Sequence, residues 1–202
     1  MSPKQQRGEA TVGKVLDAAL ALYAAKGPGG LTMSALIAET GTSSGSLYHH
    51  FGSFDGLRAA LYARSMGELL DSVAAALERS RTARSGVRAL VEAYLRFTQE
   101  DRPAAHFIHA SSYADFLPPN ADRIAEAKNP RMQRIVGWLR PHVEAGTVLP
   151  LPDPLTEMLV IAPVAETSRR WLAGDPGVDL AVAARILPER IWHSVRAPGG
   201  PA

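Results

Sequence analysis

The chain has 202 residues, with 22 Lys and Arg against 20 Asp and Glu and a formal net charge of +2. This length suits one domain, or a small domain joined to a larger one. There is no run of about 18 apolar residues, so no membrane-spanning helix is expected, and the N-terminus lacks the apolar core of a secretory signal. Cysteine is absent, which excludes disulfides and thiol chemistry and favours a cytoplasmic location.

Three helices are predicted in the first quarter of the chain, because apolar residues recur there at steps of three and four. Gly and Pro at 27–30 end the first helix and Gly41 ends the second, since Gly adopts the left-handed conformation that closes a helix. A hydroxyl residue stands before each of the two short helices, where it can cap the first turn. The predicted helices are Val12–Ala25, Met33–Thr40 after the cap Thr32, and Ser44–His50 after the cap Ser43.

Helical periodicity continues through the rest of the chain, and no segment alternates as a strand would. A long helix from the cap Ser53 to about Arg79 comes first. The others are Gly86–Glu100, Arg102–Phe116, a short polar Ala121–Lys128, Asn129–Ala145, Leu155–Ala173 and Asp179–Val195. The predicted fold class is all-α with about nine helices, followed by a disordered tail over residues 197–202.

Residues 41–45, Gly-Thr-Ser-Ser-Gly, fit the G-x-S-x-G pattern of a serine nucleophile. That chemistry needs a strand before the serine and a helix after it. Here residues 34–39 are predicted as helix, and no partners for a catalytic triad can be identified. We therefore predict no catalytic residue and no enzyme activity.

The same stretch fits the second helix of a helix-turn-helix, in which two short helices meet at a tight turn and the second enters the major groove. Small polar residues gather at the start of this helix, where base edges and phosphates come within reach. Charge is nearly balanced in residues 1–62, so the prediction depends on residue placement. The candidate DNA-binding residues are Thr32, Thr42, Ser43, Ser44, Gly45, Ser46, Tyr48 and His49, with Leu47 and Phe51 facing inward.

Residues 12–62 resemble the DNA-binding domain of the TetR family of one-component transcriptional regulators. The run Gly41–Phe51, GTSSGSLYHHF, carries most of the resemblance, together with Leu31-Thr32-Met33. The resemblance implies a DNA-binding domain over residues 1–52 with a basic arm at 1–11, and a ligand-binding and dimerisation domain over 53–196. It also implies double-stranded DNA, a small-molecule effector and a second copy of the chain as partners, with no membrane and no cofactor.

Two positions depart from the usual pattern of the family. Ile37 stands where a small residue is usual, and Phe54 stands where a lysine usually holds a phosphate. The arm residues Lys4, Arg7 and Lys14 are expected to compensate by adding phosphate or minor-groove contacts. The alternative is that the arm is a solvated, disordered terminus.

The resemblance also implies a ligand pocket among the middle helices. Polar atoms that converge on an apolar cavity are the better indicators of such a site, although core packing is the commoner role of these residues. The candidates are Phe97, His106, His109, Tyr113 and Trp138. His106 and His109 lie one helical turn apart, but no third ligand is evident, so no metal site is predicted.

The last two predicted helices are apolar on more than one face, which requires another surface to bury them. The resemblance implies that these two helices form a four-helix bundle with the same helices of a second copy. The alternative is that their apolar faces are buried within one subunit. The candidate interface residues are Leu159, Ala162, Pro163, Glu166, Ala184, Leu187 and Ile191. Pro163 and Pro188 are expected to kink their helices.

The predicted function is a transcriptional repressor that binds a palindromic operator as a homodimer and is released by a small hydrophobic ligand. One alternative is a helical small-molecule-binding protein or enzyme with a degraded helix-turn-helix. Another is an activator or architectural DNA-binding protein without an effector.

Overall fold

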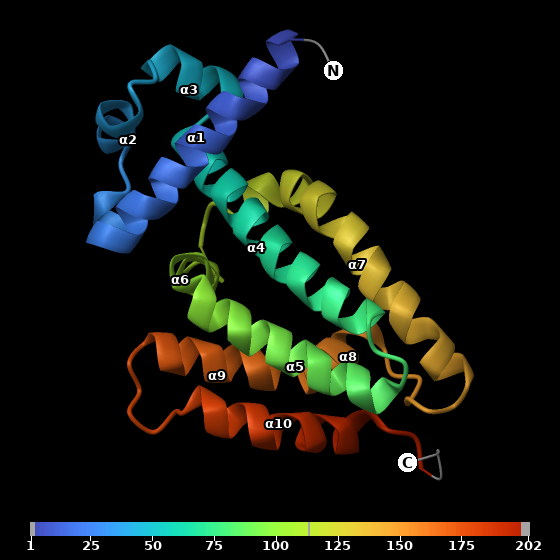
Figure 1. Cartoon of the computed structure of the whole chain (residues 1–202). Helices are drawn as coiled ribbons and strands as arrows, with labels where there is room; N and C mark the ends of the chain where they lie inside the picture. The colour runs from blue at the N-terminus through green and yellow to red at the C-terminus, as the bar shows by residue number, and fades with distance from the viewer. Residues whose placement is uncertain (1–2, 113, 199–202) are drawn as a thin grey trace. The chain divides into compact units, whose positions relative to one another are not determined.

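A computed structural model describes residues 3–112 and 114–198, and Figure 1 shows that its regular structure is helical. In these ranges there are ten α-helices and no strand beyond one isolated bridge between Val148 and Arg196. The all-α prediction is confirmed. The helices are α1 (Pro3–Lys26), α2 (Met33–Thr40), α3 (Ser44–Phe51), α4 (Phe54–Glu78), α5 (Ala83–Glu100), α6 (Arg102–Ala110), α7 (Ala121–Glu144), α8 (Asp153–Val160), α9 (Ala162–Leu172) and α10 (Leu180–Val195), with 3-10 turns at Pro28–Gly30 and Pro118–Asn120.

The described residues group into two compact units. The first unit holds residues up to 66 and residues 103–127, and the second unit holds residues 67–102 and those from 128 onward. The first unit thus contains α1 to α3, the beginning of α4, most of α6 and the beginning of α7. This grouping differs from the predicted division at residues 52 and 53, which concerns function and stays a prediction.

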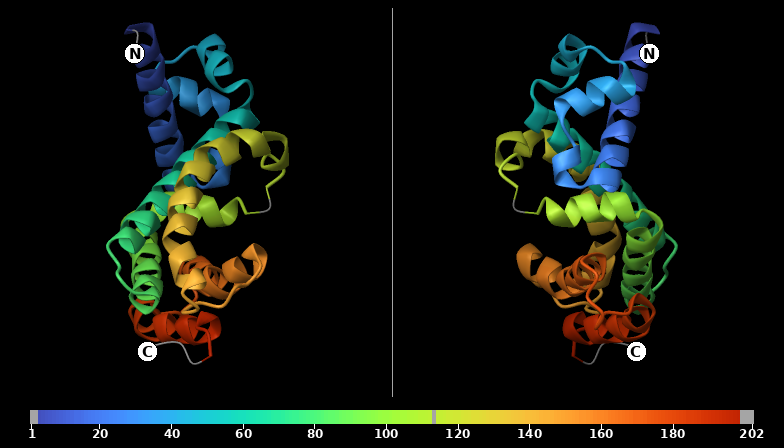
Figure 2. Two further views of the ribbon diagram at one scale, coloured as in Figure 1. Left: turned by 90° about the vertical axis from the view of Figure 1, so that its right-hand side faces the viewer. Right: turned by 90° about the vertical axis from the view of Figure 1, so that its left-hand side faces the viewer.

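The core of the first unit is built from the apolar face of α1. Leu36 of α2 and Leu47 and Phe51 of α3 pack into the same cluster, which anchors both short helices. Figure 2 shows α1 running beside α2 and α3. The buried members of the cluster are Val15, Leu16, Ala19, Leu22, Tyr23, Leu31, Leu36, Leu47, Phe51, Leu57, Ala59, Leu61, Ala63, Phe107, Phe116 and Ile124.

In the second unit, α10 packs against α5, α8 and α9 (Figure 1). Inside this group the hydroxyl oxygens of buried Thr98 and Ser168 are hydrogen-bonded at 3.0 Å. At the surface, the Glu189 carboxylate accepts from Arg84 at 2.9 Å and from Arg88 at 3.0 Å. The first of these contacts joins α5 to α9, and the pairs of Glu189 join α10 to α5.

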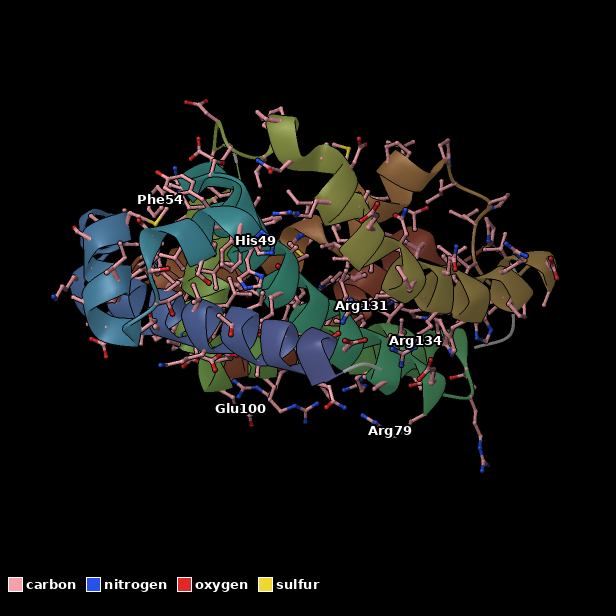
Figure 3. The ribbon with its side chains drawn as sticks, turned by 90° about the horizontal axis from the view of Figure 1, so that it is seen from above. His49, Phe54, Arg79, Glu100, Arg131 and Arg134 are labelled. Atoms are coloured by element: carbon pink, nitrogen blue, oxygen red, sulfur yellow. The ribbon has the colours of Figure 1, made fainter. Side chains whose placement is uncertain are left out.

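The C-terminal part of α4 and α7 are joined by ion pairs in the second unit. Arg131 Nε lies 2.7 Å from an Asp71 carboxylate oxygen, and Arg134 pairs with both Asp71 and Glu78. Figure 3 labels both arginines on α7. The hydrogen bond from Arg134 lowers the pKa of Glu78 from its usual value. No helix of the described residues is long and apolar enough to cross a membrane.

Two helices start earlier than predicted. α1 begins at Pro3, so residues 3–11 are helical, and a proline suits the first turn because its missing N–H needs no partner there. α5 begins at Ala83 because Thr82 and Ser85 form a reciprocal capping box. The predicted end of α6 at Phe116 is wrong: α6 ends at Ala110.

Prolines lie inside one of the later helices without ending it, and at the start of another where the chain breaks. α7 is one helix through the predicted junction, with Pro130 and Pro141 inside it. Both prolines are exposed, so the carbonyls they leave unpaired can be hydrated. The single predicted helix 155–173 is instead two, because the chain breaks at Ile161 and Pro163 enters the first turn of α9. Pro188 lies inside α10.

Candidate nucleic-acid interface

The two short helices α2 and α3 are bounded by the residues that the sequence predicts. Thr32 Oγ1 accepts a hydrogen bond from the Ala35 amide at 3.2 Å. Gly41 has a φ of 66°, a left-handed conformation, and its amide donates to the Ile37 carbonyl. Ser43 Oγ then accepts from the Ser46 amide at 3.2 Å. Because each contact spans at most four residues, the turn between the helices is fixed locally.

The geometry at Ser43 does not fit a nucleophile. The residues before it form α2 and not a strand, and its hydroxyl oxygen accepts from the first turn of α3. A nucleophile elbow requires a strand at that place. The predicted capping role of Ser43 is confirmed.

Helix α3 has one buried face and one exposed face. Leu47 is fully buried and Phe51 is 4% exposed, whereas Tyr48 is 52% exposed. Ser44, Gly45 and His49 are exposed as well, and Thr42 and Ser46 are half-buried. Figure 3 labels His49 on this helix. The candidate contact residues on α3 therefore share a solvent-facing surface, and exposed Thr32 lies at the start of α2.

The N-terminus of α3 presents amide groups to this surface. The amides of Ser44 and Gly45 have no hydrogen-bond acceptor among the described residues. Such amides, together with the positive end of the helix dipole, favour a phosphate. A Cβ added to Gly45 would have no heavy atom within 4 Å, so an approaching backbone meets no obstacle there.

Of the three basic residues named from the sequence, the structure describes the side chain of Lys14 only. Lys14 Nζ donates to the Thr40 carbonyl at 2.7 Å, so it helps to close the C-terminus of α2. Residues 3–11 are helical and not an extended arm, although the side chains of Lys4 and Arg7 lie outside the described residues. Helix α3 contains no Lys or Arg.

The two unusual positions have apolar roles in the first unit. Ile37 and Phe54 are both half-buried and pack against the core cluster. The larger Ile37 is thus accommodated between α2 and the core. Phe54, labelled in Figure 3, begins α4 and also lines a cavity in the first unit.

The residues predicted to line a ligand pocket fall in both units. His106 lies in the first unit, where its Nδ1 is 2.9 Å from Tyr23 Oη. Burial raises the pKa of Tyr23, so the phenol keeps its proton at neutral pH. His109 is half-buried in the same unit. Tyr113 lies outside the described residues, and among those described no group of three His, Asp or Glu could hold a metal.

Phe97 and Trp138 belong to the second unit. Phe97 is 8% exposed on α5. Trp138 Nε1 donates to the Ser80 carbonyl at 3.2 Å, and a Cβ on Gly86 would overlap its indole ring. Trp138 is half-buried; its ring packs on Gly86 and its indole N–H is satisfied within the protein.

The predicted dimer residues differ in exposure. Leu159 is 37% exposed and Ala162 and Glu166 are exposed, whereas Pro163, Ala184 and Leu187 are half-buried. Ile191 is only 2% exposed because its face of α10 packs inside the second unit, so little of its side chain is accessible to a second copy.

Other apolar side chains of the second unit are exposed instead. Apart from Leu159 they are not among the predicted interface residues, although Val182 and Ile186 stand four apart on one face of α10. The large exposed apolar side chains on α8 and α10 are Leu155, Met158, Leu159, Val182 and Ile186.

Residues 15–61 match the family model described as bacterial regulatory proteins, tetR family. No curated protein matches the sequence. A TetR family transcription regulator from Marinobacter aquaeolei VT8 is similar in structure, with a TM-score of 0.72 and 18% identity over 96% of this chain and 100% of that chain.

Two solved regulators named FadR are similar in fold. FadR from Bacillus halodurans, a fatty acid degradation regulator, has a TM-score of 0.68 and 18% identity over 94% of this chain and 98% of that chain. FadR from Bacillus subtilis, solved with stearoyl-CoA, has a TM-score of 0.69 and 17% identity over 88% of this chain and 96% of that chain.

Proposed function

We propose that this chain, whose residues 15–61 match the model of the tetR family of bacterial regulatory proteins, is a repressor that binds a palindromic operator as a homodimer. A small hydrophobic ligand releases the repressor from DNA. Helix α3 would lie in the major groove, and the amides at its N-terminus would meet the phosphate backbone.

The observation that carries this proposal is the exposed face of α3. Its polar residues and Tyr48 stand free of the core, while Leu47 and Phe51 hold the helix in place from behind. Among the described residues, 52% of the Tyr48 side chain stays exposed. A large aromatic side chain in that position is suited to contact with the sugar-phosphate backbone.

Dimerisation is supported by the exposed apolar residues of α8 and α10. Met158 is 62% exposed and Ile186 is 51% exposed, and exposed apolar side chains that gather on a surface mark a partner site. We propose that a second copy covers them. A two-fold dimer would then present two α3 helices to half-sites about 34–36 Å apart.

The effector is proposed to be hydrophobic. Support comes from the fold shared with the Bacillus subtilis regulator that was solved with stearoyl-CoA. The predicted pocket residues in the second unit, Phe97 and Trp138, are aromatic. A ligand releases the repressor only through a higher affinity for the state that does not fit DNA.

The test is fluorescence anisotropy with labelled DNA from the intergenic region upstream of the gene, over a series of salt concentrations. We expect sequence-selective binding that weakens steeply with salt, because phosphate contacts release counterions. Tyr48→Ala should weaken binding about tenfold or more, which corresponds to about 1.4 kcal/mol.

Met132→Ala is the matched control, since Met132 is an exposed large side chain on α7, outside the first unit. It should bind DNA as the wild type does. If neither the upstream DNA nor any sequence selected from random oligonucleotides binds more tightly than bulk DNA, the repressor proposal is overturned. The helical small-molecule-binding protein would then be the better interpretation.

A further inference from the structure

The first unit contains a cavity of about 220 Å³. Its walls come from α1, the turn after it, the start of α4, and α6 with the residues that follow. Neither Phe97 nor Trp138, the predicted pocket residues of the second unit, lines this cavity. The lining residues are Tyr23, Pro28, Leu31, Phe54, Arg58, Phe107, Ala110, Ser111 and Ala114.

Most of the wall is aromatic or aliphatic. Tyr23, Leu31 and Phe107 are buried, and the rings of Tyr23 and Phe107 meet edge to face with centroids 4.9 Å apart. Phe54 is half-buried beside them. The Tyr23 hydroxyl is engaged with His106, so the ring offers mainly its apolar surface. Such a wall suits a flat apolar group of the size of a benzene ring.

One cation lines the cavity. The Arg58 guanidinium carbon lies 4.4 Å from the centroid of the Phe116 ring, which holds the planar group in place. Arg58 also makes one ion pair, with Asp55 at 3.3 Å, and Asp55 is the more exposed partner. A guanidinium has five N–H donors, so this single long contact leaves donors for a second carboxylate.

A serine hydroxyl lines the cavity as well. Ser111 is 5% exposed, and its hydroxyl makes no hydrogen bond to the described residues. A serine hydroxyl on the wall of a cavity can donate one hydrogen bond to a ligand and accept others. The cavity therefore combines apolar walls with a cation and a free hydroxyl.

We propose that this cavity is a binding site for a small aromatic carboxylate. The ring would lie among Phe54, Phe107 and Tyr23, and the carboxylate would accept hydrogen bonds from Arg58 and Ser111. Charge-assisted bonds to a guanidinium are among the strong ones, and an apolar body is needed to use the walls. The occupant would contact α1, α4 and α6 together.

The test uses 4-fluorobenzoate as the probe, followed by 19F NMR line broadening and isothermal titration calorimetry on the full chain. We expect a dissociation constant on the order of 1 mM or tighter, as is usual for about ten non-hydrogen atoms. The neutral 4-fluorobenzamide should bind at least about tenfold more weakly because it lacks the charge, and so should acetate, which lacks the ring.

Three variants assign the site. Arg58→Gln should weaken binding at least about tenfold through the lost charge-assisted bonds. Ser111→Ala should weaken it about threefold through one lost neutral hydrogen bond. Asp55→Asn should strengthen binding about twofold, because a competing acceptor of like charge is removed.

Two further variants test whether the probe binds inside the cavity. Lys26→Gln removes an exposed cation of the first unit that does not line the cavity, and it should bind the probe as the wild type does. Ala114→Phe fills the cavity without touching a charge and should abolish binding, which keeps the test decisive if Arg58→Gln unfolds.

Absence of binding to the wild type, or equal binding to wild type and Ala114→Phe, would overturn the proposal. The site does not depend on the proposed repressor function. Operator binding by the same preparation separates the two, since protein that binds DNA but not 4-fluorobenzoate refutes the cavity site alone.

Discussion

Gly45 is a residue at which stability and DNA binding should respond in opposite directions. It lies in the first turn of α3, and a Cβ there meets nothing in the free protein. Gly45→Ala should therefore raise the free energy of unfolding by up to about 1 kcal/mol, because Ala loses less backbone entropy. It should weaken operator binding, since the added methyl stands where the DNA backbone approaches.

The measurements are chemical denaturation and anisotropy, with Gly137→Ala as the matched control. Gly137 is also helical and equally open, but it lies on α7. The control should gain stability and keep its affinity for DNA. An unchanged affinity in Gly45→Ala would contradict close approach of DNA at this residue.

The exposed carboxyl of Glu166 has a lowered pKa because two arginines bind it. Hydrogen bonds from Arg169 and then Arg170 lower the pKa of its carboxyl from 4.5 to about 2. A lowered pKa in the folded state means that the pairing stabilises the protein above pH 4.5 and that this contribution is lost as the pH falls toward 2. A carboxyl titration by NMR should give a midpoint near 2.

The two arginines should differ in this titration. Arg169→Gln should raise the pKa of Glu166 more than Arg170→Gln, because Arg169 donates two bonds of 2.7 Å and Arg170 donates one of 2.8 Å. A midpoint that neither substitution moves would refute the pairing.

At the scale of the element, substitutions of Ser43 at the start of α3 distinguish its effect on stability as a helix cap from its effect on DNA binding. Ser43→Ala removes the acceptor for the Ser46 amide and should cost about 1 kcal/mol of stability. Ser43→Asp keeps a good cap and so should be nearly as stable as the wild type. Its negative charge beside a phosphate should nevertheless abolish operator binding.

Thermal unfolding and anisotropy on the same variants test this, with Thr82→Asp on α5 as the control. Thr82 is an N-cap of the second unit, so a carboxylate there should leave DNA binding unchanged. If Ser43→Asp binds the operator normally, the start of α3 does not face DNA phosphate.

At the scale of the whole molecule, assembly should depend on the exposed side chains of α8 and α10. Ile186→Glu places a charge on a 51% exposed position and should leave the fold of one chain intact. It should weaken dimerisation about thirtyfold or more, since a central interface residue contributes about 2 kcal/mol. Operator affinity should fall with it, because one half-site alone supplies half of the contacts.

Analytical ultracentrifugation over a concentration series measures this change. Val136→Glu on α7 is the matched control, with an exposed apolar residue outside the proposed interface. It should remain dimeric. A wild-type protein that is monomeric at all concentrations, or an Ile186→Glu variant that dimerises normally, would refute this interface.

The sequence by itself determined the helix-turn-helix, including both short helices, their caps at Thr32 and Ser43, and the turn at Gly41. It could do so because a cap or a left-handed glycine acts within about four residues along the chain. The inward Leu47 and Phe51 followed from helical spacing for the same reason.

Only the tertiary structure decided which residues meet across long separations. Lys14 is bound to the Thr40 carbonyl, the cavity joins α1 to Arg58 and Ser111, and α10 exposes Ile186 while it buries Ile191. Periodicity places apolar residues on the faces of a helix, but it does not say which face its own chain covers. That choice depends on packing between helices that are distant in sequence.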